Sequence, residues 1–312
     1  MKTVSVVMAT YNGEKYLREQ LDSIINQTYP IHEIIIQDDC STDGTVAIVE
    51  EYTKKHSNIK LFVNTYNQGL NQNFKTAVMR ATGDFIALSD QDDIWFPDKI
   101  EEEMKAIGSH SVCCSYYLFG PTLDTAPVVK YEIGAERVLF RSILGHTMLC
   151  TREFIQKENS WIKKIWYDWG LAVNAYLEDG VAIVQKALNW HRHHEQEFSY
   201  LKNVIGTKPY LPYLYGYKCF RERQKQPNWF FIYSYIHNHT SAEKLPLVYT
   251  LSGLLLKKDF WSFLKLCYTC LNYRDKIYPK KEIGKGIMQY VRGFCYPLFW
   301  CYSNKHYFKE FN

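Results

Sequence analysis

The feature that most constrains the fold of this 312-residue chain is a regular alternation of short apolar runs with helical patterns near its start. Residues 2–10 are typical of a buried strand, Tyr11-Asn12-Gly13 interrupts it, and residues 14–26 follow with apolar side chains at helical spacing. Four strands thus alternate with three helices, which predicts an α/β fold with a mostly parallel sheet flanked by helices. The further predicted strands are 31–37, 60–64 and 85–88, and the further helices are 45–55 and 71–80.

Three polar clusters follow strands of this series, at residues 11–14, 38–43 and 90–93. Because the carboxyl ends of parallel strands meet at one edge of a sheet, and ligands bind there, we expect the clusters to converge. Asp90 and Asp92 can turn their oxygens toward one point, which suits a hard divalent cation that also binds phosphate oxygens. The alternative is a solvated acidic turn that caps the helix predicted to follow it.

Two further polar features lie later in the chain. Asp168, in the aromatic sequence Tyr167-Asp168-Trp169, is placed to N-cap a helix over residues 169–177. A short predicted strand at 181–184 leads into His191-Arg192-His193-His194. Taken alone, these histidines are typical of a solvated or capping cluster, because zinc sites usually have another ligand group at a recognised spacing.

The composition changes after residue 200. Residues 201–312 contain 18 Lys+Arg and 6 Asp+Glu, a net charge of +12, whereas residues 1–200 contain 19 and 27, a net charge of −8. We therefore expect an α/β domain over 1–200 and a basic, aromatic-rich helical region over 201–312. Aromatic and basic residues are mixed in this region as they are in helices that lie on a membrane surface, but packing on the α/β domain explains the pattern equally well.

The longest apolar stretch, residues 245–256, is short of the roughly 20 residues that span a bilayer. The nine cysteines have no regular spacing along the chain, and the apolar run at the N-terminus has the length of a strand rather than of a signal peptide. These observations predict free thiols and a cytoplasmic location, either in solution or peripheral on the inner face of the cell membrane.

Four sequence motifs together resemble family 2 glycosyltransferases, which have the GT-A fold. The motifs are VSVVMATY at 4–11, EIIIQDDCSTDGT at 33–45, ATGDFI at 81–86 and LSDQDDIWFP at 88–97. LSDQDDIW, followed by GHTML and YDW, is similar to the rhamnosyltransferase-like branch of that family. The resemblance covers roughly residues 1–200 and implies a GT-A catalytic domain that binds a nucleotide-diphospho-sugar and Mg²⁺ or Mn²⁺.

The resemblance also implies which residues bind the donor. In the relatives the second carboxylate after the second strand contacts the nucleobase, and it matches Asp39. Residues at the end of the first strand line the same pocket, and they match Ala9, Tyr11 and Glu14. Ala9 departs from the Ser or Thr of many members, which puts one hydrogen bond to the nucleotide in doubt.

The metal and the catalytic base are implied in the same way. The last Asp of the Asp-x-Asp motif, Asp92, is the metal ligand, with Asp90 nearer the ribose or the waters of the metal. Asp168 matches the catalytic base. Arg192 and His194 match an Arg-x-His segment near the diphosphate and the metal, although Glu195 and Glu197 replace the small polar residues that usually follow.

These expectations describe an inverting, metal-dependent glycosyltransferase in which Asp168 deprotonates the acceptor hydroxyl as a nucleoside diphosphate leaves. The resemblance suggests dTDP-rhamnose as donor, and a surface glycan or lipid-linked saccharide as acceptor. A processive polysaccharide synthase would need membrane-spanning helices and a Gln-x-x-Arg-Trp segment. The sequence predicts neither, which disfavours this alternative. The remaining alternative is a catalytically silent module that binds a nucleotide sugar or a nucleic acid, although the basic region has no recognisable nucleic-acid motif.

Overall fold

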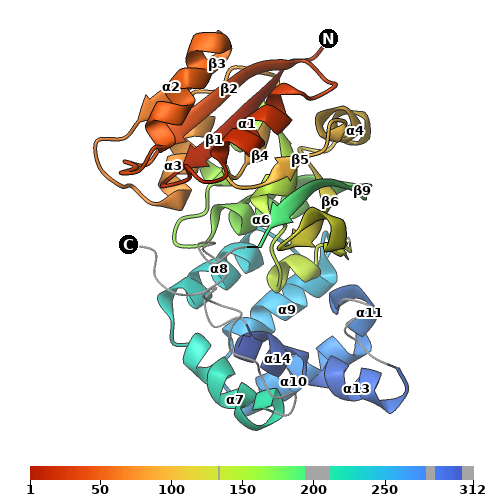
Figure 1. The fold of residues 1–312 in the computed structure, drawn as a ribbon. Helices are drawn as coiled ribbons and strands as arrows, with labels where there is room; N and C mark the ends of the chain where they lie inside the picture. The colour runs from red at the N-terminus through yellow and green to blue at the C-terminus, as the bar shows by residue number, and fades with distance from the viewer. Residues whose placement is uncertain (133, 194–210, 279–284, 304–312) are drawn as a thin grey trace.

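The computed structural model describes residues 1–132, 134–193, 211–278 and 285–303. Figure 1 shows the N-terminal strands and their helices at one end of the molecule and the helices after residue 210 at the other.

The α/β part is built on one mixed sheet with the strand order β3-β2-β1-β4-β8-β6-β9-β5, and β7 pairs with β6. The first four strands are parallel to one another, which confirms the predicted α/β order. Beyond β4 the sheet becomes mixed, because β8 and β5 run antiparallel to their neighbours. The strands are β1 (Val4–Thr10), β2 (Ile31–Asp38), β3 (Ile59–Val63), β4 (Phe85–Ser89), β5 (Ile94–Trp95), β6 (Val112–Gly120), β7 (Val128–Val129), β8 (Met148–Thr151) and β9 (Val181–Arg192).

Helices cover the sheet and form the second end of the molecule. Those of the α/β part are α1 (Leu17–Ile25), α2 (Thr45–Lys55), α3 (Leu70–Val78), α4 (Lys99–Ala106), α5 (Arg152–Ile155) and α6 (Tyr167–Glu178). Short 3₁₀ helices are η1 (Leu123–Thr125), η2 (Arg137–Leu139), η3 (Gly145–Thr147) and η4 (Glu158–Ser160). The later helices are α7 (Leu211–Arg223), α8 (Pro227–Asn238), α9 (Pro246–Leu256), α10 (Phe260–Asn272), α11 (Arg274–Ile277), α13 (Ile287–Phe294) and α14 (Tyr296–Ser303).

Alternate side chains of β1 enter two hydrophobic cores on opposite faces of the sheet. Val4, Val6 and Met8 are buried with apolar residues of α1, α2 and α4. Val7 and Ala9 are buried with those of α3 and α6. Because side chains alternate along a strand and both faces of β1 are apolar, this strand lies in the middle of a three-layer arrangement.

The second of these cores continues into the C-terminal helices, which pack on the segment around η2. The Tyr233 hydroxyl of α8 donates to the Leu139 carbonyl (2.8 Å), and the Trp300 indole of α14 donates to the Phe140 carbonyl. The Arg137 guanidinium donates to the Lys276 carbonyl (2.9 Å). The helical region is therefore joined to the α/β part by a common core.

Two predictions about the later elements are wrong. Helix α6 begins at Tyr167 and its N-cap is Trp166, so Asp168 lies in the first turn and does not cap a helix over 169–177. Tyr167 packs on Phe74 of α3, with ring centroids 4.5 Å apart, and this tertiary contact accounts for the earlier start. The strand predicted at 181–184 continues as β9 to Arg192, so His191 and Arg192 belong to the sheet.

Among the described helices, none combines the length and apolar character that a membrane span requires.

Candidate active site

The loops that follow β1, β2 and β4 are hydrogen-bonded to one another at the carboxyl edge of the sheet. The backbone N–H of Tyr11 donates to Gln91 Oε1 (2.9 Å), and Gln91 Nε2 donates to the Tyr11 carbonyl (3.0 Å). The backbone N–H of Asn12 donates to the Ser41 hydroxyl (2.8 Å). The predicted convergence of the three polar clusters is confirmed by these bonds.

Gly13 makes this close approach possible. A Cβ at this position would lie 2.3 Å from Gln91 Oε1, too close for any non-bonded contact. The Gly13 N–H also donates to the Thr45 hydroxyl (2.8 Å) at the start of α2. A side chain at residue 13 would therefore displace Gln91 and loosen the loop that carries Asp90 and Asp92.

The residues expected to bind the nucleotide lie around this edge. Ala9 is buried near the end of β1, and Tyr11 is exposed just after it. The Glu14 carboxylate is exposed and accepts from the Gly44 N–H (2.6 Å), so it also satisfies the N-terminus of α2.

Asp39 is buried and organises the loop before α3. Its carboxylate accepts hydrogen bonds from Asn64 Nδ2 (2.8 Å) and from the backbone N–H groups of Gln68 (2.7 Å) and Gly69 (2.8 Å). Three donors hold the carboxylate in one orientation at the carboxyl end of β2. The Asp39 carboxylate is therefore fixed in place at this edge of the sheet.

The acidic loop after β4 brings several carboxylates close together. Burial, followed by the negative charges of Asp93 and Asp92, raises the pKa of Asp90 well above its ordinary value. The charge of Asp168, in the first turn of α6, makes a smaller contribution to the same shift. Repulsion between carboxylates disfavours their charged forms unless a cation compensates it. The oxygen donors and their surplus negative charge fit a hard divalent cation.

Arg192 lies beside this loop, at the end of β9. Its Nε donates to the Asp92 carbonyl (3.3 Å), and its guanidinium pairs with Glu19 and stacks 4.4 Å from the centre of the Tyr16 ring. The expected neighbourhood of Arg192 and the Asp-x-Asp loop is thus present. His194 lies outside the described residues.

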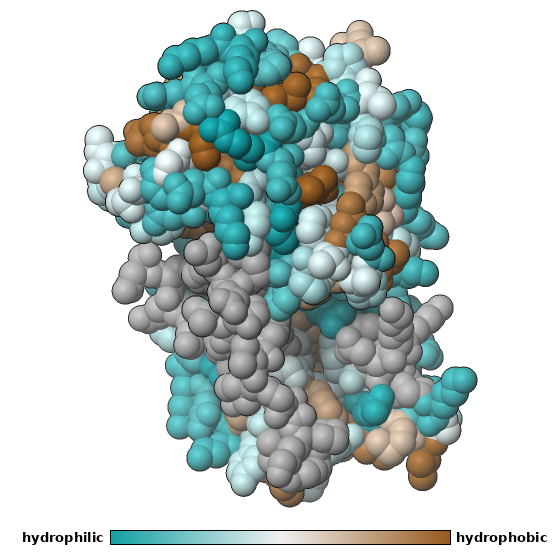
Figure 2. Space-filling view, viewed as in Figure 1, coloured by the Kyte–Doolittle hydropathy of each residue, from teal (hydrophilic) through white to brown (hydrophobic). Residues whose placement is uncertain are grey.

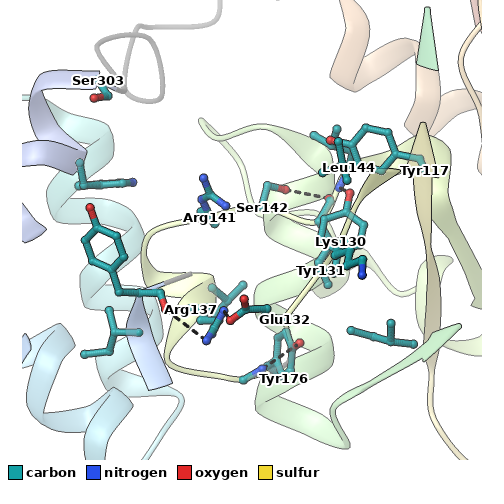
Figure 3. Close-up of a pocket in the computed structure, with 18 of the residues that line it drawn as sticks. Tyr117, Lys130, Tyr131, Glu132, Arg137, Arg141, Ser142, Leu144, Tyr176 and Ser303 are labelled. Carbon is teal, nitrogen blue, oxygen red and sulfur yellow. Dashed lines mark hydrogen bonds and ion pairs between the residues drawn. The ribbon is translucent and has the colours of Figure 1, made fainter. Parts of the chain in front are cut away.

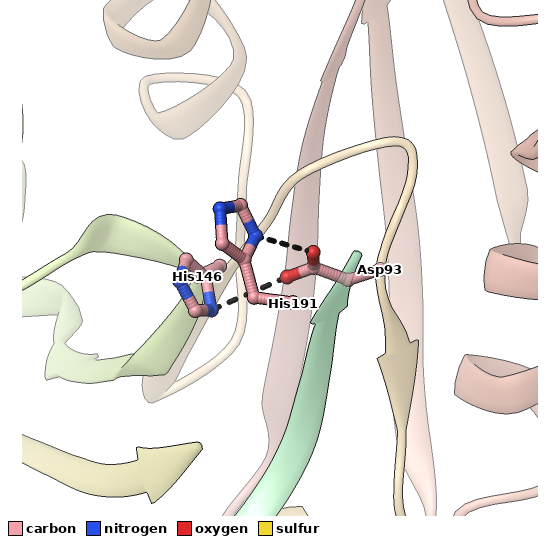
Figure 4. A group of neighbouring side chains, drawn as sticks. All are labelled: Asp93, His146 and His191. Carbon is pink, nitrogen blue, oxygen red and sulfur yellow. Dashed lines mark hydrogen bonds and ion pairs between the residues drawn. The ribbon is translucent and has the colours of Figure 1, made fainter. Parts of the chain in front are cut away.

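A second polar cluster is formed by Asp93, His146 and His191, which Figure 4 shows, together with Asn189. The Asp93 carboxylate is fully buried and accepts from His191 Nδ1 (2.7 Å). Burial, with a smaller effect from the charges of His191 and Lys99, holds the pKa of His146 well below its ordinary value. The neutral His146 ring stacks on His191 with centroids 4.4 Å apart, and its Nδ1 lies 2.8 Å from the Asn189 amide nitrogen.

Sequence reasoning missed this cluster. It took Asp92, Asp90 and His194 as metal ligands, whereas the structure brings together Asp93, His146 and His191, whose ligand atoms lie within 4.8 Å of one another. One signal was available, since residues 189 and 191 share a face of any strand that includes both. By distance the three groups can also hold a metal ion. Both imidazole Nδ1 atoms already have a polar partner, whereas His146 Nε2 is buried without one among the described residues, so hydrogen bonds account for only part of the arrangement.

A cavity of about 640 Å³ lies between the later strands of the sheet and the C-terminal helices (Figure 3). His191 lines it, so the cavity reaches the second polar cluster. Its walls combine aromatic rings with the basic side chains of Lys130, Arg137 and Arg141, of which Arg137 pairs with Glu132. The Trp169 indole, next to Asp168, donates to the carbonyl of the cavity residue Val138. Aromatic rings with cationic groups suit a saccharide that carries negative charge.

Comparison with known proteins connects these features to a family. The protein-family model described as "Glycosyl transferase family 2" matches residues 5–165. The chain is 32% identical over 161 residues to "Putative teichuronic acid biosynthesis glycosyltransferase TuaG" of Bacillus subtilis, which covers 50% of this chain and 63% of the relative. It is 30% identical over 141 residues to "UDP-Glc:alpha-D-GlcNAc-diphosphoundecaprenol beta-1,3-glucosyltransferase WfgD" of Escherichia coli, which covers 45% and 54%. The chain thus matches less than two thirds of the length of these relatives.

Solved structures resemble nearly the whole chain. TarS 1–349 of S. aureus, solved in complex with UDP-GlcNAc, has a TM-score of 0.58 at 18% identity and covers 96% of this chain and 89% of TarS. The mannosyltransferase PcManGT of Pyrobaculum calidifontis, in complex with GDP-Man and Mn²⁺, has a TM-score of 0.53 at 15% identity and covers 99% and 88%. At these identities the likeness concerns the fold, and it confirms the predicted GT-A-like α/β architecture.

Proposed function

Because the family model matches residues 5–165, this chain belongs to glycosyl transferase family 2, and we propose that it is an inverting enzyme that moves a sugar from a nucleotide-diphospho-sugar to an acceptor hydroxyl. The observation that carries the proposal is the hydrogen-bonded convergence of the loops after β1, β2 and β4, which brings the Asp90–Asp92 loop to the same edge of the sheet as the loops after β1 and β2. In this proposal the carboxylates of the acidic loop hold a cation at the carboxyl edge of the sheet, and Asp168 supplies the general base.

Asp168 is the proposed general base. It lies half-buried in the first turn of α6, where its Oδ1 accepts from the Trp169 N–H (2.7 Å). It takes the proton of the acceptor hydroxyl while the oxygen forms a bond to the anomeric carbon. The bond from that carbon to the phosphate oxygen breaks at the same time, and the nucleoside diphosphate leaves with the electron pair. General-base catalysis of this kind typically contributes ~10²- to 10⁴-fold.

Asp92 and Asp90 are the proposed ligands of Mg²⁺ or Mn²⁺, with His194 as a further ligand. The carboxylate-rich loop supports this assignment, and so does the Mn²⁺ named with the structural neighbour PcManGT. When bound, the ion supplies positive charge that stabilises the departing diphosphate. Arg192, held against the Asp92 carbonyl, would add a second positive charge beside the loop.

The donor pocket is proposed to comprise Ala9, Tyr11, Glu14 and Asp39, which surround the same sheet edge. The LSDQDDIW sequence makes dTDP-rhamnose the first donor to test. The printed names of relatives and neighbours include UDP-Glc, UDP-GlcNAc and GDP-Man, so UDP- and GDP-sugars belong in the same panel.

The acceptor is proposed to be a surface-glycan or lipid-linked saccharide, bound in the cavity beside His191 and met at the inner face of the cell membrane. The mixed aromatic and basic walls of the cavity support this, and WfgD is named for an acceptor linked to diphosphoundecaprenol. Replacing Arg141 by Gln should raise KM for an anionic acceptor and leave KM for the donor unchanged. An equal rise in both would remove the cavity from the proposal.

The first experiment measures nucleotide release from UDP-, GDP- and dTDP-sugars with and without Mn²⁺, with Asp92→Asn as the matched control. We expect metal-dependent release from one donor class and its loss in the variant. If no donor releases its nucleotide but calorimetry shows that a donor binds, the enzyme requires its acceptor for turnover. Absence of both release and nucleotide binding would overturn the proposed function.

A further inference from the structure

Exposed apolar side chains gather on α7, α10 and α13, at the end of the molecule opposite β1 to β3 (Figure 1). Trp261 is 77% exposed and Ile287 is 78% exposed, whereas Trp169, Trp229 and Trp300 are buried. Figure 2 shows apolar residues next to hydrophilic ones at this end. We call this surface the aromatic end and define it by its most exposed members, Leu214, Tyr215, Phe260, Trp261, Tyr268 and Ile287.

Three exposed rings of α7 and α10, those of Tyr217, Phe260 and Trp261, are in contact with one another in series. The rings of Tyr217 and Phe260 meet edge to face with centroids 6.2 Å apart, and Phe260 lies 6.1 Å from Trp261. Tyr217 also packs on the buried Phe263, with centroids 4.8 Å apart, so the surface is anchored on the core. Single exposed apolar residues are ordinary, but a contiguous patch of this kind indicates a binding surface.

Basic side chains border these rings. Lys218 on α7 and Lys265 on α10 are exposed on the same helices as Tyr215 and Trp261, and Lys257 and Lys258 are exposed just before α10. The described residues after 210 include 12 Lys+Arg and 4 Asp+Glu, a net charge of +8, whereas the sequence of residues 1–200 carries −8. An anionic plane would therefore attract the aromatic end and repel the opposite end, which fixes one orientation of the molecule.

This chemistry matches an anionic bilayer better than a protein partner. Tryptophan and tyrosine favour the boundary between headgroups and acyl chains, and neighbouring lysines bind the anionic headgroups. We propose that the aromatic end binds the surface of a bilayer that contains anionic phospholipid, without crossing it. This rests on the proposed function only in that it brings the enzyme to a lipid-linked acceptor.

The test is sedimentation of the full-length chain with vesicles of phosphatidylcholine alone or mixed with phosphatidylglycerol, at low and high salt. We expect binding to the anionic vesicles that weakens as salt is raised. Phe260→Ser with Trp261→Ser, and separately Lys257→Glu with Lys258→Glu, should each weaken that binding at least about tenfold. The matched controls are Tyr66→Ser, a 65% exposed aromatic residue of the α/β part, and Lys54→Glu with Lys55→Glu, an exposed basic pair on α2.

The outcomes separate this inference from the proposed function. Loss of vesicle binding in the α10 variants, with nucleotide release and circular dichroism unchanged, supports the membrane surface. Wild-type binding in those variants, equal loss in the controls, or salt-resistant binding to neutral vesicles would overturn it. Conversion of a dimer to a monomer by the Trp261 variant, with no effect on vesicle binding, would identify the surface as a contact between copies. Vesicle binding without any nucleotide release would leave this inference standing and remove the proposed function.

Discussion

Asp92 and Asp93 are adjacent in the sequence but differ in burial and in hydrogen bonding. Asp92 is half-buried in the acidic loop, whereas Asp93 is fully buried and hydrogen-bonded to His191. We expect Asp93→Asn to lower the free energy of unfolding by roughly 2–3 kcal/mol, because it weakens a buried, charge-assisted hydrogen bond. Asp92→Asn should change stability by less than about 1 kcal/mol. Urea unfolding of the two variants checks this.

The same pair of variants distinguishes the two sets of possible metal ligands. If Asp90 and Asp92 hold the ion, Asp92→Asn abolishes Mn²⁺-dependent nucleotide release while the protein remains folded. A folded Asp93→Asn variant that loses Mn²⁺ binding, beside an Asp92→Asn variant that keeps it, would transfer the metal to the cluster of Asp93, His146 and His191.

Asp168 offers a direct test of the chemistry. Asp168→Asn keeps the shape of the side chain and its bond to the Trp169 N–H, but removes the ability to accept a proton. We expect donor affinity by calorimetry to change little and transfer to fall by ~10²- to 10⁴-fold. An Asn variant with wild-type transfer would exclude Asp168 as the base.

Local features of the site could be predicted from the sequence, whereas contacts between distant segments could not. The acidic loop and the loops after β1 and β2 were predictable, because each follows its own apolar run. The contact of Asp93 with His146 and His191 depends on the pairing of β9 with both β5 and β6, which no local pattern encodes. The start of α6 was mispredicted for a similar reason. Asp168 is a good capping residue by type, but the helix begins at Tyr167, whose ring packs on Phe74, and this tertiary contact is not visible in the local sequence.

At the scale of elements, Gln91 couples the loop after β1 to the loop after β4. Gly13→Ala should displace the Gln91 side chain, and we expect weaker donor binding with a loss of roughly 1 kcal/mol in stability. Gln91→Ala should have a similar effect. Because both changes break the same two bonds, the double variant should be no worse than either single one, and strict additivity in a double-mutant cycle would contradict the coupling.

Glu33 joins β1, β2 and β3 with the turn before β4. Burial raises the pKa of its carboxyl, but hydrogen bonds from Lys60 (2.7 Å), Thr82 and Ser5 outweigh burial and lower the pKa to about 2 from an ordinary 4.5. A lowered folded-state pKa stabilises the fold above pH 4.5, and this stabilisation, roughly 3 kcal/mol, is lost as the pH falls from 4.5 toward 2.

Glu33→Gln should therefore flatten the dependence of unfolding free energy on pH in this window. Glu51→Gln is the matched control, since Glu51 pairs with Arg18 on the surface and should have little effect. Identical pH profiles for the wild type and Glu33→Gln, measured by urea unfolding between pH 2 and pH 6, would contradict the assignment.

At the scale of the whole molecule, the two parts predicted from composition share one core. The hydrophobic cluster that contains Val7 and Phe74 also contains Trp229, Leu251 and Trp300. We expect a single cooperative unfolding transition by calorimetry, and we expect a fragment of residues 1–200 to aggregate because the apolar face around η2 would be exposed. Two resolved transitions, or a soluble and folded fragment, would show that the parts are independent domains.

The composition of the sequence shows a change in net charge and aromatic content near residue 200, but it does not show that the two parts share a core. The apolar residues around Phe140 are equally consistent with a core that lies entirely within the α/β part. The charge difference between the two parts was readable directly from the residues.

The bonds that join α8 and α14 to the segment around η2 also constrain how such an enzyme can be altered. A chimaera could exchange the C-terminal helices for those of a relative at residue 200. The carbonyls of Leu139 and Phe140 would then lose the hydrogen bonds that Tyr233 and Trp300 donate to them. The exchangeable module is therefore discontinuous: it consists of the C-terminal helices together with the stretch around η2. Recombination or engineering that exchanges the C-terminal helices has to carry both pieces at once.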